Sequence, residues 1–129
     1  MPHPNETRIR ETFAAFMRGD VKPAQSLFDR NVVTHVLRHG PLPGDLRGLD
    51  AFLAWGGQLF ELSGGTFSEE LLGVVADDRT GFQRGVFRAT RKGRTLEDHS
   101  VNVYRFDQGR VVETWVFFGN PSGFDDFWS

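Results

Sequence analysis

Residues 80–118 read TGFQRGVFRATRKGRTLEDHSVNVYRFDQGRVVETWVFF. Polar and apolar side chains alternate along much of this stretch, and turn residues interrupt it at Lys92-Gly93 and at Asp107-Gln108-Gly109. Alternation with a period of two is typical of strands, and a short glycine-containing turn is typical of a hairpin. We therefore predict an antiparallel meander of four strands, over about 66–76, 80–91, 94–106 and 110–118.

Helical patterns dominate the N-terminal half. Apolar residues from Ile9 to Met17 recur on one face of a helix that we expect to begin at an Asn5 cap and end at Gly19. Asp20 is the expected cap of a second, short helix that ends near Leu27-Phe28.

A strand over Val32–Leu37 and a Pro/Gly loop over 40–44 precede a third helix, over about 49–62. Gly56-Gly57 lies inside that helix, where each glycine costs ~1 kcal/mol relative to alanine. We interpret the pair as a site of close packing against a strand or a partner backbone. Helices followed by a sheet predict one α+β domain over 1–129, with three N-terminal helices on a strongly bent, mostly antiparallel sheet around a conical cavity.

Composition narrows the classes of partner. Lys and Arg total 15 against 17 Asp and Glu, so the net charge of -2 provides no basic field for nucleic acid or for an anionic membrane. The chain contains 13 Phe, 3 Trp and no Cys, which predicts an aromatic core or pocket without disulfides or thiolate chemistry. The N-terminus lacks the pattern of a signal peptide, and we expect a cytoplasmic protein.

Several segments together resemble one family. They include Phe16-Met17-Arg18-Gly19-Asp20, Val32-Val33-Thr34-His35-Val36, Tyr104-Arg105-Phe106-Asp107-Gln108-Gly109-Arg110 and the terminal Asp126-Phe127-Trp128. In order and spacing they resemble the SnoaL-like, polyketide cyclase-like branch of the NTF2-like superfamily. The resemblance implies a cone-shaped α+β barrel, often dimeric, in a superfamily that contains isomerases, cyclases, hydrolases, dehydratases and non-enzymatic binding proteins.

The resemblance also implies what this chain lacks. The tyrosine, base aspartate and second acid of ketosteroid isomerases match Thr12, Val36 and Asn102 here. The base aspartate of SnoaL-like cyclases matches Asn120, whose amide can orient a ligand but cannot accept a proton at neutral pH. We therefore expect no ketosteroid isomerase activity.

One face of the strand over 94–106 carries the candidate site. Asp98, Asn102 and Tyr104 alternate on that face, and a two-residue turn at Lys92-Gly93 places Gln83 near Asn102 and Arg88 near Glu97. A carboxylate in a Phe-rich cavity would be desolvated, which raises its pKa toward the range of a general acid or base, so Asp98 is the candidate catalytic residue. The alternative is that Asp98 only hydrogen-bonds a neighbouring element. The ligand-binding candidates are Asn102, Gln83, Tyr104, Asn120, Thr34 and Phe118.

No metal or cofactor is expected, because the common nucleotide and metal motifs are absent from the sequence. His35 and His39 would lie ~13 Å apart along a strand, too far to share an ion. His35 is most simply a strand histidine with a satisfied ring, and a role as a base is the alternative.

Three functions remain open. The first is binding of a small, apolar, cyclic or polyketide-like molecule with cofactor-free acid/base chemistry, such as cyclisation, isomerisation or dehydration. The second is a non-catalytic binding module, and the third is a dimeric interaction domain. Because residues 111–118 are apolar on both faces, we expect a homodimer through the outer face of the sheet.

Overall fold

The computed structural model describes residues 2–37 and 44–129. Helices and strands follow in the order α1 (Pro4–Met17), α2 (Lys22–Leu27), β1 (Phe28–Val36), β2 (Asp45–Arg47), α3 (Leu49–Leu62), β3 (Ser68–Ala76), β4 (Thr80–Arg91), β5 (Arg94–Asp107), β6 (Arg110–Phe118) and α4 (Pro121–Trp128). This is the α+β class that the sequence predicts.

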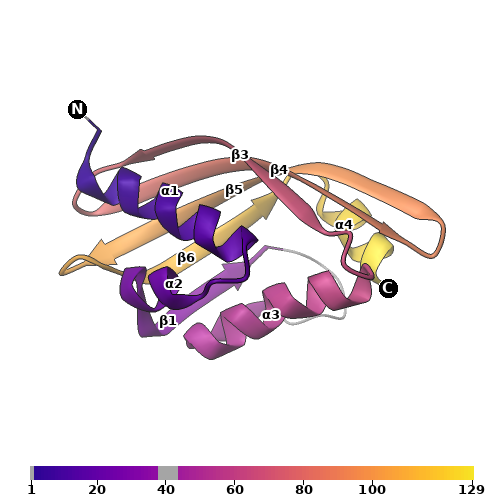
Figure 1. The fold of residues 1–129 in the computed structure, drawn as a ribbon, viewed down its shortest axis with the longest axis horizontal. Helices are drawn as coiled ribbons and strands as arrows, with labels where there is room; N and C mark the ends of the chain where they lie inside the picture. Colours follow the sequence, from indigo (N-terminus) through magenta and orange to yellow (C-terminus); the bar gives the residue numbers. More distant parts are fainter. Residues whose placement is uncertain (1, 38–43) are drawn as a thin grey trace.

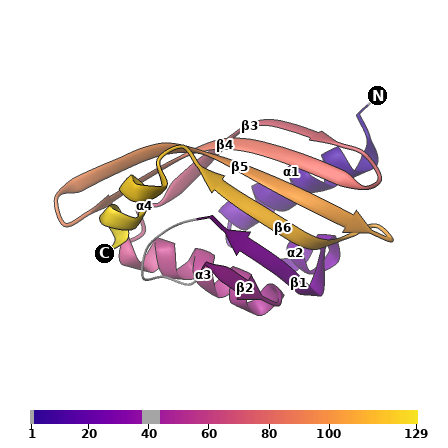
Figure 2. The ribbon, with the colours of Figure 1, turned by 180° about the vertical axis from the view of Figure 1, so that it is seen from behind.

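The six strands form one curved sheet in the order β2-β1-β6-β5-β4-β3. All neighbours pair antiparallel except β1 and β6, which are parallel. Figure 1 shows α1 lying across the face of β3, β4 and β5, while α3 lies beside β1. Figure 2, from behind, shows the outer face of the sheet without a covering helix and α4 at the end of β6.

The hairpin register agrees with the sequence prediction. Gln83 pairs with Asn102 and Arg88 pairs with Glu97 across β4 and β5. Arg88 and Glu97 also form an ion pair of 3.1 Å on the exposed face, a type of contact that contributes at most ~1 kcal/mol. The predicted turn explains this agreement, because Lys92 and Gly93 both adopt positive φ (52° and 75°) between Arg91 and Arg94.

The predicted helix starts need correction. The N-cap of α1 is His3, whose Nδ1 accepts the backbone N–H of Asn5, so Asn5 lies in the first turn. The N-cap of α2 is Val21, and Asp20 accepts the N–H of Lys22 from just outside the helix.

The region between the second and third predicted helices also differs from the prediction. Residues 29–31, which lie between the predicted second helix and the predicted strand over Val32–Leu37, belong to β1, where the pairing with β6 shifts register between Phe28 and Val33. The short strand β2 was not predicted. Residues 40–43 of the predicted Pro/Gly loop lie outside the described residues.

Gly56 packs closely, as expected, but against a different partner. A Cβ atom at Gly56 would lie 3.1 Å from the ring of Phe16 on α1, whereas Gly57 has nothing within 4 Å. The close neighbour is therefore a side chain of another helix rather than a strand or a partner backbone.

The C-terminal aromatic residues fold back as a helix. Phe124, Phe127 and Trp128 of α4 are each at most 4% exposed and pack with Leu59 and Phe87. Among the described residues, none of the helices is long and apolar enough to cross a membrane.

Candidate functional site

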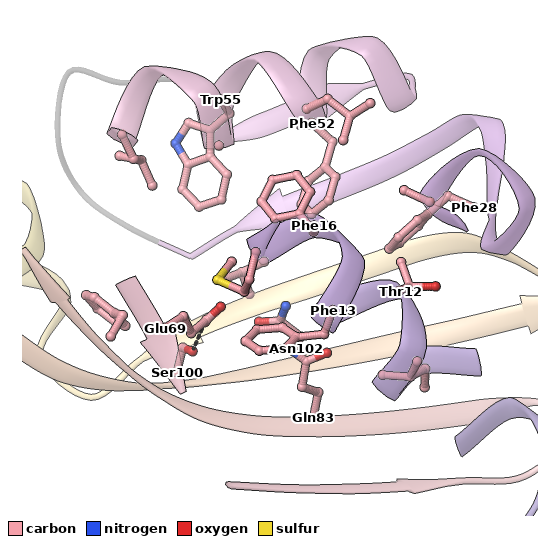
Figure 3. Close-up of a pocket in the computed structure, with 18 of the residues that line it drawn as sticks. Thr12, Phe13, Phe16, Phe28, Phe52, Trp55, Glu69, Gln83, Ser100 and Asn102 are labelled. Carbon is pink, nitrogen blue, oxygen red and sulfur yellow. Dashed lines mark hydrogen bonds between the residues drawn. The ribbon is translucent and has the colours of Figure 1, made fainter. Parts of the chain in front are cut away.

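A cavity of about 120 Å³ lies between the inner face of the sheet and the helices. Phe13 and Phe16 of α1 and Phe52 and Trp55 of α3 form its helical wall. Figure 3 shows Phe52 and Trp55 facing Glu69, Ser100 and Asn102, which come from the sheet. The cavity therefore has an aromatic helical wall opposite a sheet wall that carries amide and carboxylate groups, an arrangement typical of small-molecule sites.

The first polar group is a chain of hydrogen bonds across β4 and β5. Asn102 Nδ2 donates to the Tyr104 hydroxyl over 3.3 Å, and that hydroxyl donates to Gln83 Oε1 over 2.9 Å. Tyr104 is buried, and its ring packs edge-on against Phe28. Burial raises the pKa of the Tyr104 phenol, which therefore stays neutral and serves as a fixed hydrogen-bonding group.

The second polar group is the carboxylate of Glu69 on β3. Glu69 Oε1 accepts a hydrogen bond of 3.2 Å from the Ser100 hydroxyl on β5 (Figure 3). Burial raises the pKa of Glu69 from 4.5 to about 6, and the bond from Ser100 opposes that rise. At neutral pH the carboxylate is mostly ionised, yet it takes up a proton more readily than an ordinary glutamate.

Glu69 reaches Ser100 because β4, the strand between them, carries no side chain at the crossing. Gly85 pairs with Ser100 on one side and with Leu71 on the other. A Cβ atom at Gly85 would lie 3.5 Å from Glu69 Cγ and only 3.0 Å from the carbonyl oxygen of Glu70. The glycine leaves space for the glutamate to lie across the strand.

Four of the seven predicted site residues line the cavity: Gln83, Asn102, Tyr104 and Phe118. The ring of Phe118 stacks on Phe124 of α4, with centroids 4.0 Å apart, so α4 closes one end of the cavity.

Asp98 does not lie on the cavity wall, contrary to expectation. Its carboxylate accepts the backbone N–H groups of His99 and Asn120, both over 2.8 Å, and lies against Gly119. The turn between β6 and α4 covers this end of β5, which explains why the side chain shares a strand face with Asn102 but not its surroundings. The catalytic role of Asp98 stays a prediction.

Asn120 and Thr34 also lie away from the cavity lining. Asn120 caps α4, where its Oδ1 accepts the N–H of Gly123 over 3.0 Å. Thr34 is fully buried on β1 opposite Thr114 of β6, and neither hydroxyl has a hydrogen-bond partner among the described residues.

Glu69 was missed by the sequence reasoning, although one signal was present. It lies between Phe67 and Leu71 at a spacing of two, so a carboxylate shares a strand face with two apolar side chains. A charge in such a position on an inner strand face indicates either a buried acid or an edge.

The outer face of the sheet carries a separate polar cluster. His35 lies between Glu113, at 2.7 Å from Nε2, and Asp45, at 3.1 Å from Nδ1, and its ring stacks on Trp115. Arg105 Nε binds the second oxygen of Glu113 over 3.1 Å. The hydrogen bond from the His35 ring to Glu113 is the main cause of a raised pKa at His35. Both ring nitrogens are engaged, as the simpler interpretation of His35 expects, and His39 lies outside the described residues.

Comparison with known proteins identifies the family of this chain. The SnoaL-like domain matches residues 9–114, which is most of the chain. The chain belongs to the SnoaL-like domain family. Its curved sheet and covering helices are those of the NTF2-like fold, in agreement with the resemblance seen in the sequence.

Individual relatives of this SnoaL-like protein cover nearly its whole length. The uncharacterized protein Rv0034 of Mycobacterium tuberculosis is 29% identical over 123 residues, covering 94% of this chain and 93% of the relative. Bal32a, from a soil-derived mobile gene cassette, is 32% identical with a TM-score of 0.89, covering 97% and 96% of the two chains. TerC, crystallised with polyporic acid, has a TM-score of 0.80 at 16% identity and shares the fold, covering 97% and 98%.

Proposed function

We propose that this SnoaL-like protein binds a small, largely apolar, cyclic or polyketide-like molecule in the cavity and that Glu69 moves a proton to or from it. The observation that carries the proposal is the position of the Glu69 carboxylate, opposite Phe52 and Trp55 and bonded to Ser100. A carboxylate with a pKa of about 6 exchanges protons near neutral pH, as a general acid or base requires. The chemistry is cofactor-free cyclisation, isomerisation or dehydration.

The shape of the cavity supports a flat, apolar ligand. Aromatic rings from α1 and α3 face the sheet, and the amide and carboxylate groups of the lining are on the sheet side. Aromatic faces favour stacked rings, whereas a few fixed polar groups orient the ligand. TerC, which shares the fold, was crystallised with polyporic acid. Arg, Lys and His are absent from the described lining, so an anionic ligand would find no positive partner there.

A general probe tests the proton-transfer role without knowledge of the natural substrate. Ring opening of 5-nitrobenzisoxazole needs only a base in an apolar site, and the product is coloured. We expect the wild-type protein to accelerate this reaction above free acetate and the rate to rise with pH through about 6, the pKa of Glu69. Glu69→Gln should reduce the rate by roughly 100-fold.

Two matched variants make the test specific. Glu70→Gln removes a neighbouring carboxylate whose side chain is 64% exposed and should leave the rate unchanged. Asp98→Asn tests the residue that the sequence favoured, and we expect it to retain the rate. Loss of activity in Asp98→Asn but not in Glu69→Gln would reverse the assignment. Ligand binding without proton transfer in any variant would favour the non-catalytic module.

We also propose that two copies associate through the outer face of the sheet. Paired residues form a row across that face: Val75, Phe82, Val103 and Trp115, ending at His35. Val75 is 67% exposed and Phe82 is 49% exposed, and water is an unfavourable environment for such a continuous apolar row. A second copy would cover it. The cytoplasmic location expected from the sequence remains a prediction.

A further inference from the structure

Three polar side chains of the cavity, of which Gln83 and Tyr104 are buried and Asn102 is half-buried, form a single unit. Gln83 on β4 and Asn102 on β5 are register partners, and the Tyr104 hydroxyl bonds both amides. Gln83 is 6% exposed and Tyr104 is 4% exposed, so both side chains are held away from bulk water. All three line the cavity, and Figure 3 shows the Gln83 and Asn102 side chains close together on its sheet side.

The chemistry of a phenol constrains what this unit presents. A tyrosine hydroxyl donates one hydrogen bond, and here it also accepts one. Asn102 donates its N–H to Tyr104, which leaves Asn102 Oδ1 as the unengaged acceptor. Tyr104 donates to Gln83 Oε1, which leaves the N–H groups of Gln83 Nε2. Within the part of the chain that the structure describes, no other hydrogen bond engages these two groups.

The two amides therefore present different groups to the cavity, Gln83 a donor and Asn102 an acceptor. If both amides were turned over, Gln83 would donate to Tyr104 and Tyr104 would donate to Asn102. The cavity would then present Gln83 Oε1 as acceptor and Asn102 Nδ2 as donor. In either arrangement one amide offers a donor and its neighbour offers an acceptor, because one hydroxyl cannot donate to both.

From this geometry we infer that Tyr104 is a positioning residue and that the cavity selects uncharged ring compounds in which a carbonyl acceptor is adjacent to an O–H or N–H donor. Enolised diketones, hydroxyketones and cyclic amides are compounds of this class. This inference rests on the proposed function for the existence of a bound ligand and adds its chemical class. An acceptor alone would leave one amide without a partner inside an apolar cavity, which costs binding free energy.

Tyr104 does not need to touch the ligand to act. Its hydroxyl is engaged by both amides, and its ring lies against Phe28 with centroids 5.9 Å apart. Before a ligand binds, the phenol already holds the two amides so that one presents a donor and the other an acceptor to the cavity. This lowers the free-energy cost of ordering them on binding.

A pair of small probes tests the donor and acceptor pattern. 2-Pyridone carries a C=O beside an N–H, and 1-methyl-2-pyridone carries the same C=O with the N–H blocked. We expect NMR titration of the wild-type protein to show roughly tenfold tighter binding of 2-pyridone, the size expected for one well-made hydrogen bond. Tyr104→Phe should reduce this preference to about twofold or less while leaving the affinity for 1-methyl-2-pyridone nearly unchanged.

Two further variants separate positioning from structural damage. Asn102→Leu removes one amide directly and should also abolish the preference, even if Tyr104→Phe folds poorly. Thr12→Val changes another polar residue of the lining, on α1, and should retain it. Equal preference in wild type and Tyr104→Phe, or no binding of 2-pyridone at 10 mM, would overturn the inference.

The outcome is separable from that of the proton-transfer test. Glu69→Gln should leave the 2-pyridone preference intact, because Glu69 bonds Ser100 and not the amides. A wild-type protein that shows the preference but no 5-nitrobenzisoxazole activity would keep the ligand class and reject the proton-transfer role.

Discussion

The Glu69 carboxylate on β3 binds the Ser100 hydroxyl on β5 over 3.2 Å, although β4 lies between the two strands. The side chain crosses β4 at Gly85, which pairs with Ser100. Because Gly85 has no side chain, the Glu69 carboxylate of β3 can lie across β4. The carboxylate lies over the cavity, and burial there is the main cause of its raised pKa.

Substitution at Gly85 should move Glu69. The new Cβ of Gly85→Ala would lie 3.0 Å from the Glu70 carbonyl oxygen, so the backbone of β3 next to Glu69 must shift, and it would take up the space beside Glu69 Oε1 at a contact distance of 3.6 Å. We expect the pKa of Glu69, followed by the chemical shift of its carboxyl carbon, to fall from about 6 toward 4.5. Gly73→Ala on β3 has open space at its Cβ position and serves as the control. An unchanged pKa in Gly85→Ala would contradict the crossing role of the glycine.

Removing the Glu69 charge should stabilise the fold at neutral pH. Since folding raises the pKa of Glu69, the protonated form is favoured in the folded state, and stability is lost as pH rises from about 4.5 through about 6. Glu69→Gln should therefore match the wild type near pH 4 and exceed its free energy of unfolding at pH 7 by ~1–2 kcal/mol. Urea unfolding at the two pH values measures the difference, with Glu70→Gln as the control. A destabilised Glu69→Gln at pH 7 is the contrary result.

His35, on the outer face of the sheet, should contribute a second pH dependence to the stability of the fold. The hydrogen bond that the ring donates to Glu113, and then the one that it donates to Asp45, favours the protonated ring and raises the pKa of His35 in the folded state. Its stabilising contribution is complete below the ordinary pKa of histidine and is lost as pH rises through the raised value. Thermal unfolding should show a larger fall between pH 6 and pH 8 for the wild type than for His35→Gln. His99→Gln, at an exposed position on β5, should behave like the wild type.

Helix α4 should be essential to the end of the cavity. Phe124 is 1% exposed and packs on both Phe87 and Phe118. Phe124→Ala should lower the free energy of unfolding by ~3–5 kcal/mol, as removal of a buried aromatic ring does. The substitution Asp126→Ala, at an exposed position on the same helix, is the control in denaturant titrations. A loss of less than 1 kcal/mol in Phe124→Ala would show that α4 does not close the cavity.

The outer sheet face should set the oligomeric state. We expect sedimentation of the wild type at micromolar concentration to give a dimer, and Phe82→Lys to give the monomer of 14.6 kDa, because a charge in the apolar row cannot be buried without a partner. Phe60→Lys changes an aromatic residue that is 53% exposed on α3 and should leave the dimer intact. A monomeric wild type would refute association through this face.

Local chemistry determined the elements whose signals lie within a few residues. The Lys92-Gly93 turn alone sets the register of β4 against β5, because a two-residue turn permits only one pairing of the strands that it joins. The placement of Gln83 beside Asn102 followed from it. The helix and strand periods of the sequence, with their order, likewise determined the α+β class.

The position of the catalytic carboxylate candidate was decided only by the tertiary structure. Asp98 and Asn102 share a strand face, but the chain from β6 into α4 returns over Asp98 and binds it through the Asn120 N–H. Glu69 enters the cavity because β3 pairs with β4 and because Gly85 has no side chain where Glu69 lies across β4. Strand alternation determines which face of the sheet a side chain occupies. Its exposure to solvent, and hence its pKa, depends on the segments, distant in sequence, that cover that face.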